Sequence, residues 1–380
     1  MRPRGCAEIP SVIAIPVFIL IALGILFAGH YFVYASFVYF FAITAPWEQA
    51  VLAATFFFLV LSFIVAMFVA HRYEGRSVRA FYFGSTLWLG VGLTLLTTFS
   101  FAWTAWGAAA SLARNPSRFE VGSITVTAAL LYSAYGVANA YYPRVVRHSI
   151  RLKHLPPSWR GRTLVQLSDI HLGQVIGTRF LARVVERVNA LRPAAVLITG
   201  DLFDGNDGNL EALVAPLQGL TAEQGVYFVT GNHETYLGVE RAFAALSGTG
   251  VRILDNECVN VEGLQLVGIS YLRRGSAGSF TETLASVSGF DSSQPSVLLY
   301  HSPSQIAEAK AAGIGLQLSG HVHQAQLFPL QFITRLIFGK YHHGLNVEED
   351  FTVYTTSGTG LWGPTMRTGN HPEIVAITLS

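Results

Sequence analysis

The chain has 380 residues and a formal charge of +2, because 25 Lys and Arg residues nearly balance 23 Asp and Glu residues. Only 13% of the residues are charged and 51% are apolar, whereas a soluble globular chain carries about 25% charged residues. This composition excludes a disordered chain and argues against a single soluble domain. The balanced charge gives no reason to expect nucleic acid as a partner. The two cysteines are too few for a disulfide framework or a zinc site made of cysteines.

The first 143 residues have the pattern of a membrane domain. Each of four uncharged runs is long enough for one membrane-spanning helix, which needs about 20 mostly apolar residues. The runs are 9–47, 49–71, 80–113 and 121–143. We therefore predict an α-helical membrane domain over 1–143 with about four transmembrane helices, the first of them over 14–40. A second membrane segment within 9–47 is the alternative for this part of the chain.

Basic residues in the short loops predict the orientation, because Lys and Arg are retained on the cytoplasmic side of a membrane. If both termini are cytoplasmic, only Arg114 and Arg118 lie outside. The other basic residues that flank the spans then lie inside, at positions 2, 4, 72, 76, 79, 144, 147, 151, 153, 160 and 162. The distribution therefore predicts an integral protein of the inner or plasma membrane with its C-terminal domain in the cytoplasm.

A basic, proline-containing linker over 144–162 precedes a region with a different pattern. Over 163–380, short apolar runs alternate with amphipathic segments such as 178–192, which is typical of an α/β domain. The predicted strands are 163–168, 194–199, 226–230, 251–254, 264–269, 296–300, 315–319, 352–356 and 374–379.

Five polar motifs follow five of these predicted strands. They are Asp169-Ile170-His171, Gly200-Asp201, Gly231-Asn232-His233-Glu234, His301 and Gly320-His321-Val322-His323. Ligands bind at the carboxyl ends of strands in open α/β sheets, so we expect the motifs to converge on one edge. Residues i and i+2 of an extended segment point the same way, which lets Asp169 and His171 offer two ligands to one small volume. The pair His321 and His323 has the same spacing.

The chemistry of these motifs favours a metal site. They offer imidazole, carboxylate and amide groups but no thiolate, a mixture that suits Mn²⁺, Fe or Zn²⁺. The number of such groups exceeds what one four-coordinate ion needs, which indicates two divalent metal ions.

The order and spacing of the motifs resemble those of the calcineurin-like metallophosphoesterase superfamily over 160–380. The resemblance implies a four-layer αββα sandwich of two mixed sheets, occupying 163–380, and a binuclear metal site. By motif, the ligands would be Asp169, His171 and His323 for the first metal, Asn232, His301 and His321 for the second, and Asp201 as the bridge. The resemblance also implies that His233 is catalytic without binding metal, so that no serine or cysteine nucleophile is required.

Three further features depart from the motif set or extend it. Glu234 is expected to orient a metal ligand, and Arg367 resembles a basic residue of membrane-linked relatives that could bind phosphate. Many relatives have two glycines where this chain has Gln324 and Ala325, a change that narrows the site but leaves the ligands intact.

An apolar stretch over 327–338 follows the last motif and is too short to span a bilayer. One interpretation is a core helix that closes the sandwich. The other is a flap that enters the membrane interface and guides acyl chains toward the metals, with Arg335 and Lys340 facing anionic head groups.

Several spans followed by this domain resemble the transmembrane metallophosphoesterase subfamily, some members of which hydrolyse UDP-2,3-diacylglucosamine, a lipid A precursor. We therefore expect a membrane-anchored two-metal phosphoesterase or pyrophosphatase that acts on a lipid-linked substrate. The alternatives are a transporter or channel with a regulatory phosphatase domain, a broad-specificity phosphodiesterase, and an inactive metal-binding scaffold. The uncharged runs, in which His30 is the only imidazole inside an expected span, favour an anchor over a transporter.

Overall fold

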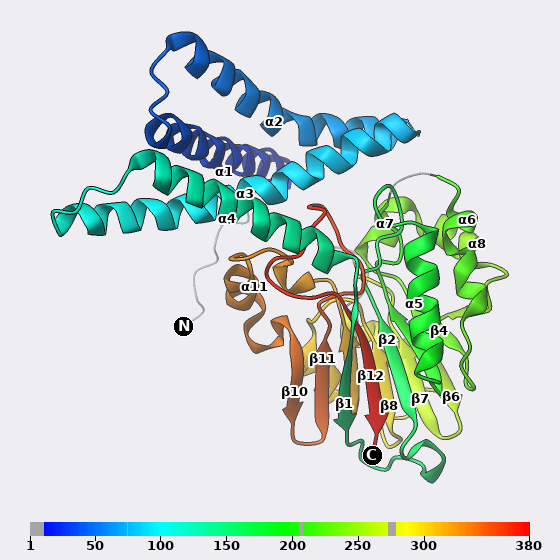
Figure 1. Cartoon of the computed structure of the whole chain (residues 1–380). Coiled ribbons are helices and arrows are strands. Elements are labelled where there is room, and N and C mark those ends of the chain that lie inside the picture. The colour runs from blue at the N-terminus through cyan, green and yellow to red at the C-terminus, as the bar shows by residue number, and fades with distance from the viewer. Residues whose placement is uncertain (1–10, 74, 206–207, 273–278) are drawn as a thin grey trace. The chain divides into compact units, whose positions relative to one another are not determined.

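The computed structural model describes residues 11–73, 75–205, 208–272 and 279–380. Its first part consists of four helices, coloured from blue to green in Figure 1. They are α1 (Ser11–Phe40), α2 (Pro46–Arg72), α3 (Arg76–Ser111) and α4 (Arg118–Ala140). All four are long and apolar enough to cross a membrane, so the four predicted spans are present as helices of the required length.

The chain divides into two compact units. The first comprises Met1–Phe68 and Trp88–Tyr132, and the second comprises Val69–Leu87 and Ser133–Ser380. Within the first unit, aromatic side chains from different helices pack together around Phe40, Phe56 and Phe99. The last two turns of α4, from Ser133 onward, belong to the second unit.

Strands of the second unit form two mixed sheets of six strands each in the described residues. The first sheet has the order β1 (Arg144–Ile150), β12 (Glu373–Leu379), β2 (Thr163–Leu167), β3 (Ala195–Thr199), β4 (Val226–Val229) and β5 (Val251–Ile253). The second has the order β10 (Gly344–Glu348), β11 (Phe351–Thr355), β9 (Leu316–Ser319), β8 (Ser296–Leu299), β7 (Leu264–Gly268) and β6 (Glu257–Val261). Strands β2 to β5 run parallel, as do β11, β9, β8 and β7.

The sheets pack face to face because their strands are apolar on both sides. Between them lies a buried cluster with Leu164 and Leu197 from the first sheet and Leu299 and Leu318 from the second. The outer faces are covered by helices, so the domain has the predicted four layers. These helices are α5 (Thr178–Ala190), α6 (Leu210–Val214), α7 (Asn232–Leu237) and α8 (Val239–Leu246) with the first sheet, and α9 (Phe280–Ser286) and α10 (Ile306–Ala311) with the second. The short 3₁₀ turns are η1 (Pro157–Trp159), η2 (Ala215–Gly219), η3 (His323–Ala325) and η4 (Gly339–His342).

All nine predicted strands are present, and each boundary is within one residue of the prediction. Three more strands are present as edge strands: β1 in the first sheet, and β6 and β10 in the second. Strand β1 occupies residues 144–150, which the sequence analysis placed in the basic linker. Its arginines, Arg144 and Arg147, are exposed, because an edge strand can carry charged side chains that a central strand cannot.

Helix α11 (Gln331–Phe338) forms most of the apolar stretch that follows the last motif. None of its residues is buried. The interpretation of this helix as a core element is therefore wrong.

Candidate metal centre

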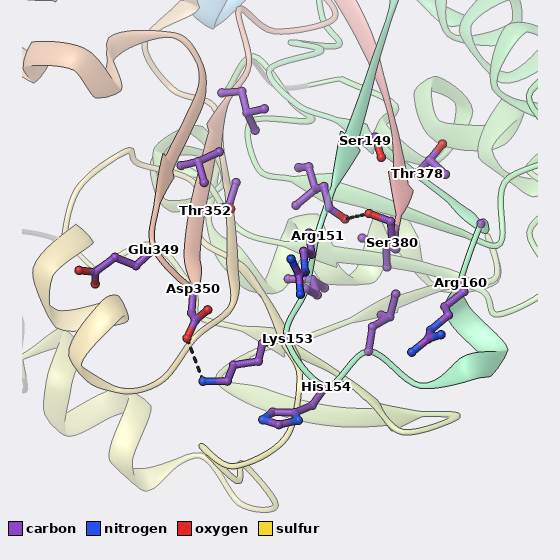
Figure 2. Close-up of a pocket in the computed structure, with 17 residues that line it drawn as sticks. Ser149, Arg151, Lys153, His154, Arg160, Glu349, Asp350, Thr352, Thr378 and Ser380 are labelled. Atoms are coloured by element: carbon purple, nitrogen blue, oxygen red, sulfur yellow. Dashed lines mark hydrogen bonds and ion pairs between the residues drawn. The ribbon is translucent and has the colours of Figure 1, made fainter.

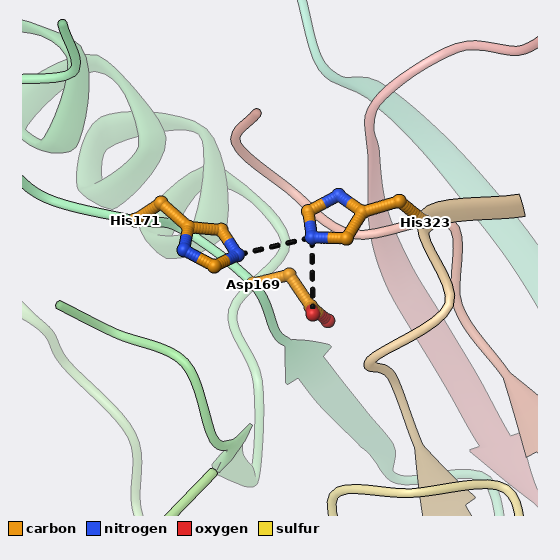
Figure 3. A group of neighbouring side chains, drawn as sticks. All are labelled: Asp169, His171 and His323. Carbon is orange, nitrogen blue, oxygen red and sulfur yellow. Dashed lines mark hydrogen bonds and ion pairs between the residues drawn. The ribbon is translucent and has the colours of Figure 1, made fainter. Parts of the chain in front are cut away.

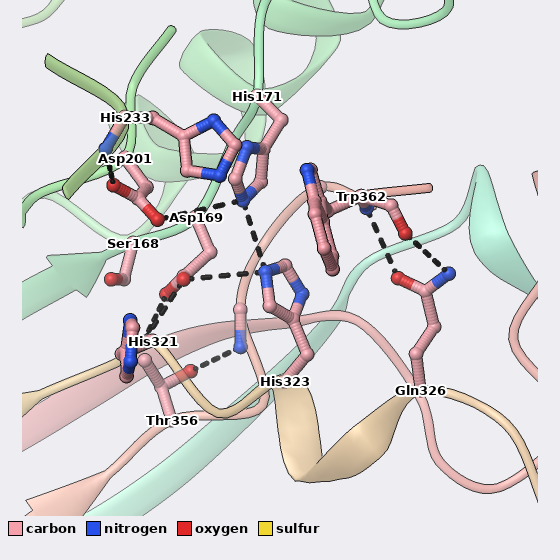
Figure 4. A network of polar contacts seen from close by, with 12 residues as sticks. Ser168, Asp169, His171, Asp201, His233, His321, His323, Gln326, Thr356 and Trp362 are labelled. Carbon is pink, nitrogen blue, oxygen red and sulfur yellow. Dashed lines mark hydrogen bonds and ion pairs between the residues drawn. The ribbon is translucent and has the colours of Figure 1, made fainter. Parts of the chain in front are cut away.

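The five motifs meet at one edge of the sandwich, as predicted. Strands β2, β3 and β4 of the first sheet and β8 and β9 of the second each lead into one motif at their carboxyl ends. Three overlapping groups of side chains result, and within each group the potential ligand atoms lie within 4.8 Å of one another. Two of the groups can be followed in Figure 4: Asp169, His171 and His323, and His171, Asp201 and His233. The third consists of Asp201, His301 and His321.

The first group contains the three residues expected to hold one metal (Figure 3). His323 Nε2 lies 3.0 Å from His171 Nε2 and 3.3 Å from Asp169 Oδ1. Asp169 is fully buried, and both of its oxygens accept from the backbone N–H of His321, at 2.9 and 3.1 Å. The carboxylate is thereby held between the two imidazoles and the loop that follows β9.

Asp201 faces both groups of expected ligands. Its Oδ2 lies 3.0 Å from His301 Nε2 and 3.9 Å from His171 Nε2. On the His301 side, Nε2 of that ring is also 3.2 Å from Asn232 Oδ1 and 3.3 Å from His321 Nδ1. The structure therefore brings all seven expected metal ligands into one continuous cluster, with Asp201 in the middle.

The backbone of this cluster is strained. Five expected ligand positions have left-handed backbone, with φ values between 48° and 72°. They are Asp169, His171, Asp201, His321 and His323. For residues other than glycine this conformation costs about 1–2 kcal/mol each, and such residues concentrate at functional sites.

Two glycines allow the backbone to come close to the carboxylates. A Cβ added at Gly231 would lie 2.1 Å from Asp201 Oδ1, and one added at Gly320 would lie 2.1 Å from Asp169 Oδ2. Any side chain at either position would therefore displace a carboxylate from the cluster.

Glu234 organises the loops that carry Asp201 and Asn232. Its carboxylate accepts from the backbone N–H groups of Gly231 at 2.6 Å, Asp201 at 3.0 Å, Leu202 at 2.9 Å and Phe203 at 3.1 Å. Four such donors hold a buried carboxylate in one orientation. These contacts support the expectation that Glu234 orients a ligand, since they fix the main chain at Asp201 and at Gly231, next to Asn232.

The protonation pattern follows from burial and charge. Burial alone would lower the pKa of His301, but the Asp201 carboxylate overrides burial and raises this pKa to about 10. Burial opposes ionisation of Asp201, but the positive His301 ring holds the pKa of that carboxyl below its usual range. His301 and Asp201 therefore form a buried ion pair.

Two imidazoles of the cluster, His321 and His323, are neutral. Burial and the positive charge of His301 lower the pKa of His321 to about 4. Burial, with His171 and Arg367 close by, lowers the pKa of His323 well below its ordinary value. Neutral imidazole is the form that binds a cation, so these rings need not lose a proton to do so.

The donor set fits divalent cations. Imidazole nitrogens face each other at 3.0 Å between His171 and His323 and at 3.3 Å between His301 and His321. Two lone pairs at these distances repel unless a proton or a cation lies between them. Each pair also adjoins a buried carboxylate, which stabilises positive charge. Each pair can therefore bind a cation in place of the proton that would otherwise lie between its two nitrogens.

His233 lies at the edge of the cluster, at the start of α7. Its backbone N–H donates to Asp201 Oδ1 at 2.9 Å, and its ring Nδ1 lies 2.9 Å from the carbonyl oxygen of Asp204. Because a carbonyl only accepts, Nδ1 carries the proton and Nε2 has the lone pair. Burial and the nearby His171 lower the pKa of His233.

Exposed aromatic residues beside His233 were missed by the motif analysis. Tyr236 and Trp362 are 63% and 53% exposed, and their rings lie 5.5 and 5.8 Å from the His233 ring. Tyr271 approaches His301 and His321 with ring distances of 6.1 Å. They carry only a weak sequence signal, because Tyr236 lies in the six-residue helix α7 and Tyr271 and Trp362 lie in loops without a periodic pattern.

Arg367, the expected phosphate-binding residue, is fully buried. Its guanidinium donates from Nη2 to Gly360 O at 2.6 Å and from Nη1 to Asn370 Oδ1 at 2.8 Å. Nη2 also lies 3.1 Å from His323 Nδ1, on the side of the ring opposite the Nε2 that faces the cluster. Arg367 thus lies behind His323, an expected metal ligand, and its guanidinium contacts His323, Gly360 and Asn370.

A separate cavity of about 950 Å³ lies at the other end of the sheets (Figure 2). It is bordered by the segment that follows β1, by the β10–β11 turn and by the end of β12. Lys153 and Asp350 form an ion pair of 2.9 Å at its edge. None of the expected metal ligands lines this cavity, so it is distinct from the candidate metal centre.

Comparisons with known proteins agree with the geometry. A family model described as calcineurin-like phosphoesterase matches residues 162–325. The chain is 35% identical to a Danio rerio protein named transmembrane protein with metallophosphoesterase domain, over 71% of this chain and 64% of that protein. It is 30% identical to an uncharacterized metallophosphoesterase of Campylobacter jejuni, over 69% of each chain.

A third relative, an uncharacterized metallophosphoesterase of Aquifex aeolicus, is 31% identical over 66% of this chain and 97% of its own length. The chain thus spans nearly all of this relative but less than two thirds of the Danio rerio protein. Together with the cluster of buried His and Asp side chains, these similarities show that the chain belongs to the calcineurin-like metallophosphoesterase family.

Proposed function

We propose that this protein is a membrane-anchored phosphoesterase that uses two metal ions to hydrolyse a phosphodiester or pyrophosphate bond. The observation that carries the proposal is the position of Asp201 between two groups of buried ligands. Asp169, His171 and His323 would hold one ion, Asn232, His301 and His321 the other, and Asp201 both. Two ions such as Mn²⁺, Fe or Zn²⁺ supply positive charge for the phosphoryl oxygens and activate water at neutral pH.

His233 would act on the leaving oxygen. The Asp204 carbonyl holds its Nδ1–H at 2.9 Å, which fixes the ring with Nε2 free to exchange a proton. Because the pKa of His233 is lowered, its protonated form is a strong acid. Nε2, which carries the lone pair in the neutral ring, would take up a proton from solvent and give it to the leaving oxygen as the bond to phosphorus breaks.

The substrate that we propose is lipid-linked, with UDP-2,3-diacylglucosamine of the lipid A pathway as the leading candidate. The four long apolar helices support this choice, because acyl chains keep such a substrate in the bilayer that holds the enzyme. Tyr236 and Trp362 offer exposed ring faces beside His233 on which a planar base such as uracil could stack. The basic residues of the loops support a cytoplasmic position for the domain.

The environment of His30 supports an anchor rather than a transport pathway. His30 Nδ1 lies 2.8 Å from the carbonyl oxygen of Leu26, and His30 Nε2 accepts from Trp88 Nε1 at 2.9 Å. Both ring nitrogens thus have partners within the first unit. A histidine with both nitrogens satisfied serves helix packing, whereas a proton or ion pathway needs one available to water.

The proposal is tested by assaying the purified protein in detergent with Mn²⁺, against UDP-2,3-diacylglucosamine, unrelated phospholipids and a chromogenic phosphodiester. Metal-dependent release of UMP from the first substrate supports the proposal. Hydrolysis of the chromogenic compound without UMP release would contradict the proposed substrate but would still support hydrolysis by a two-metal centre. A protein that binds two metals and hydrolyses none of these compounds would contradict the proposed enzyme.

A further inference from the structure

Helix α11 presents an apolar face to the outside of the domain. Phe332 and Ile333 are 62% and 53% exposed, and Leu336 and Ile337, one turn later, are 86% and 67% exposed. At 100° per residue these four side chains share one side of the helix. Four large apolar side chains on one exposed face form a patch that soluble surfaces rarely carry without a partner.

The orientation of α11 is the reverse of that of an ordinary surface helix. Of its polar side chains, Arg335 is exposed, whereas Gln331 and Thr334 are half-buried. Thr334 Oγ1 lies 3.5 Å from His342 Nδ1 in η4. A surface helix normally turns its apolar stripe inward and its polar residues outward. The reversed arrangement places the apolar stripe where an apolar medium outside the protein would cover it.

The start of α11 is tied to the end of a membrane helix through the loop at Thr368. On one side of this loop, the backbone N–H of Arg367 donates to Gly136 O in α4 at 2.9 Å. On the other side, Thr368 Oγ1 accepts from the backbone N–H of Phe328 at 3.2 Å, three residues before α11. All these residues belong to the second unit.

Asn139 strengthens the same connection. Its side-chain Nδ2 donates to Arg367 O at 2.8 Å and to Asn370 O at 2.7 Å. It lies at the end of α4 and is followed by Tyr141 and Tyr142, which are side chains typical of the membrane–water interface. The loop that supports α11 is therefore fixed to the part of α4 that meets the membrane surface.

From these contacts we propose that α11 is an interfacial helix whose apolar face, formed by Phe332, Ile333, Leu336 and Ile337, lies in the head-group region of the lipid bilayer. Arg335 is exposed on the same helix, in the position of a basic residue that contacts anionic head groups. Because η3 with His323 directly precedes this helix, such docking would hold the metal centre at the membrane surface. The inference rests on the membrane anchor and not on the identity of the substrate.

The experiment places a fluorescent label on this face in the full-length protein. Leu336→Cys is made in a background in which serine replaces Cys6 and Cys258, labelled with an environment-sensitive dye, and reconstituted into nanodiscs of phosphatidylcholine and phosphatidylglycerol. Thr221→Cys is the matched control, because Thr221 is exposed in the loop before β4, at the end of the sheet away from the metal centre. Ile337→Cys provides a second position on the apolar face, and metal content verifies folding.

We expect the label at position 336 to show blue-shifted emission, quenching by lipids with a nitroxide on the acyl chain, and protection from aqueous iodide. The label at position 221 should show the opposite response. Equal iodide quenching at both positions would overturn the proposal. A label at 336 shielded from both quenchers would also overturn it, because protein rather than lipid would then cover the face. None of these readouts depends on hydrolysis, so failure of the proposed activity is distinguishable from failure of this inference.

Discussion

The geometry of His233 favours a role as proton donor over a role as metal ligand. Its ring lies in the same group of potential ligand atoms as His171 and Asp201, yet its Nδ1 is occupied by the Asp204 carbonyl. In the proposed reaction it acts on the leaving oxygen through Nε2 and binds no metal.

We therefore expect His233→Ala to retain two metal ions per chain while losing about 2–4 kcal/mol of transition-state stabilisation, the usual loss for one electrostatic donor. Metal analysis and kcat of the same preparation are the measurements. Loss of one ion from the variant would show instead that His233 is a ligand.

His301 makes metal binding dependent on pH. The Asp201 carboxylate raises the pKa of His301 to about 10, so this ring is protonated at neutral pH and must lose its proton to bind a cation. Metal affinity should therefore rise as the pH rises toward 10, and binding at neutral pH should release a proton. Calorimetric titration of metal-free protein in two buffers with different ionisation enthalpies measures this release. Identical heats in both buffers would contradict the His301–Asp201 ion pair.

At the scale of elements, the turn η3 carries strain that its sequence does not relieve. Gln324, Ala325 and Gln326 all have left-handed backbone, with φ values of 47°, 59° and 59°. The side chain of Gln326 compensates by donating to Pro364 O at 2.6 Å and accepting from the backbone N–H of Trp362 at 3.1 Å.

Ala325→Gly should therefore stabilise the domain, by up to about 1 kcal/mol, since glycine adopts a positive φ without the penalty that alanine incurs. The midpoint of chemical denaturation, measured beside the wild type, gives this difference. Ala309→Gly is a suitable control, because Ala309 is buried inside α10 and its replacement should destabilise. A lower midpoint for Ala325→Gly would show that the turn is not strained.

Strands β2, β3, β4, β8 and β9 could be predicted from the sequence because each is a short, mostly buried apolar run that ends in a motif. The edge strands β1, β6 and β10 could not, since their exposed sides carry polar residues and give no continuous apolar signal. The apolar character of α11 could be predicted from the sequence. Which face of the helix packs against the domain could not. That choice depends on the folded domain, which leaves Gln331 and Thr334 half-buried and the apolar side chains exposed.

The site was predictable to a similar extent. The motif glycines and ligands follow strands, so their convergence at one edge could be expected from the sequence alone. The burial of Arg367 could not, because it depends on Gly360 and Asn370, which only the folded loop brings to its guanidinium.

At the scale of the whole molecule, the loop charges predict that the C-terminal domain is cytoplasmic. Two reporters are fused in turn after Ser380. A reporter that functions only in the cytoplasm should therefore give a signal, and a reporter that functions only outside the cell membrane should give none. Reversal of the basic residues at positions 114 and 118 to glutamate is the control and should leave this orientation unchanged, since it removes positive charge only from the outer side. Activity of the exterior reporter in the wild type would refute the orientation.

The central claim is a two-metal centre bridged by Asp201, and titration of metal-free protein with Mn²⁺, with hydrolysis of a chromogenic phosphodiester as the readout, tests it most directly. Asp201→Asn is the matched variant, because it keeps the shape of the side chain and its oxygen for the backbone N–H of His233. We predict that wild-type activity requires two equivalents of metal, and that Asp201→Asn binds fewer ions and is slower by orders of magnitude. Full wild-type activity with one ion, or a variant with two ions and a near-normal rate, would contradict it.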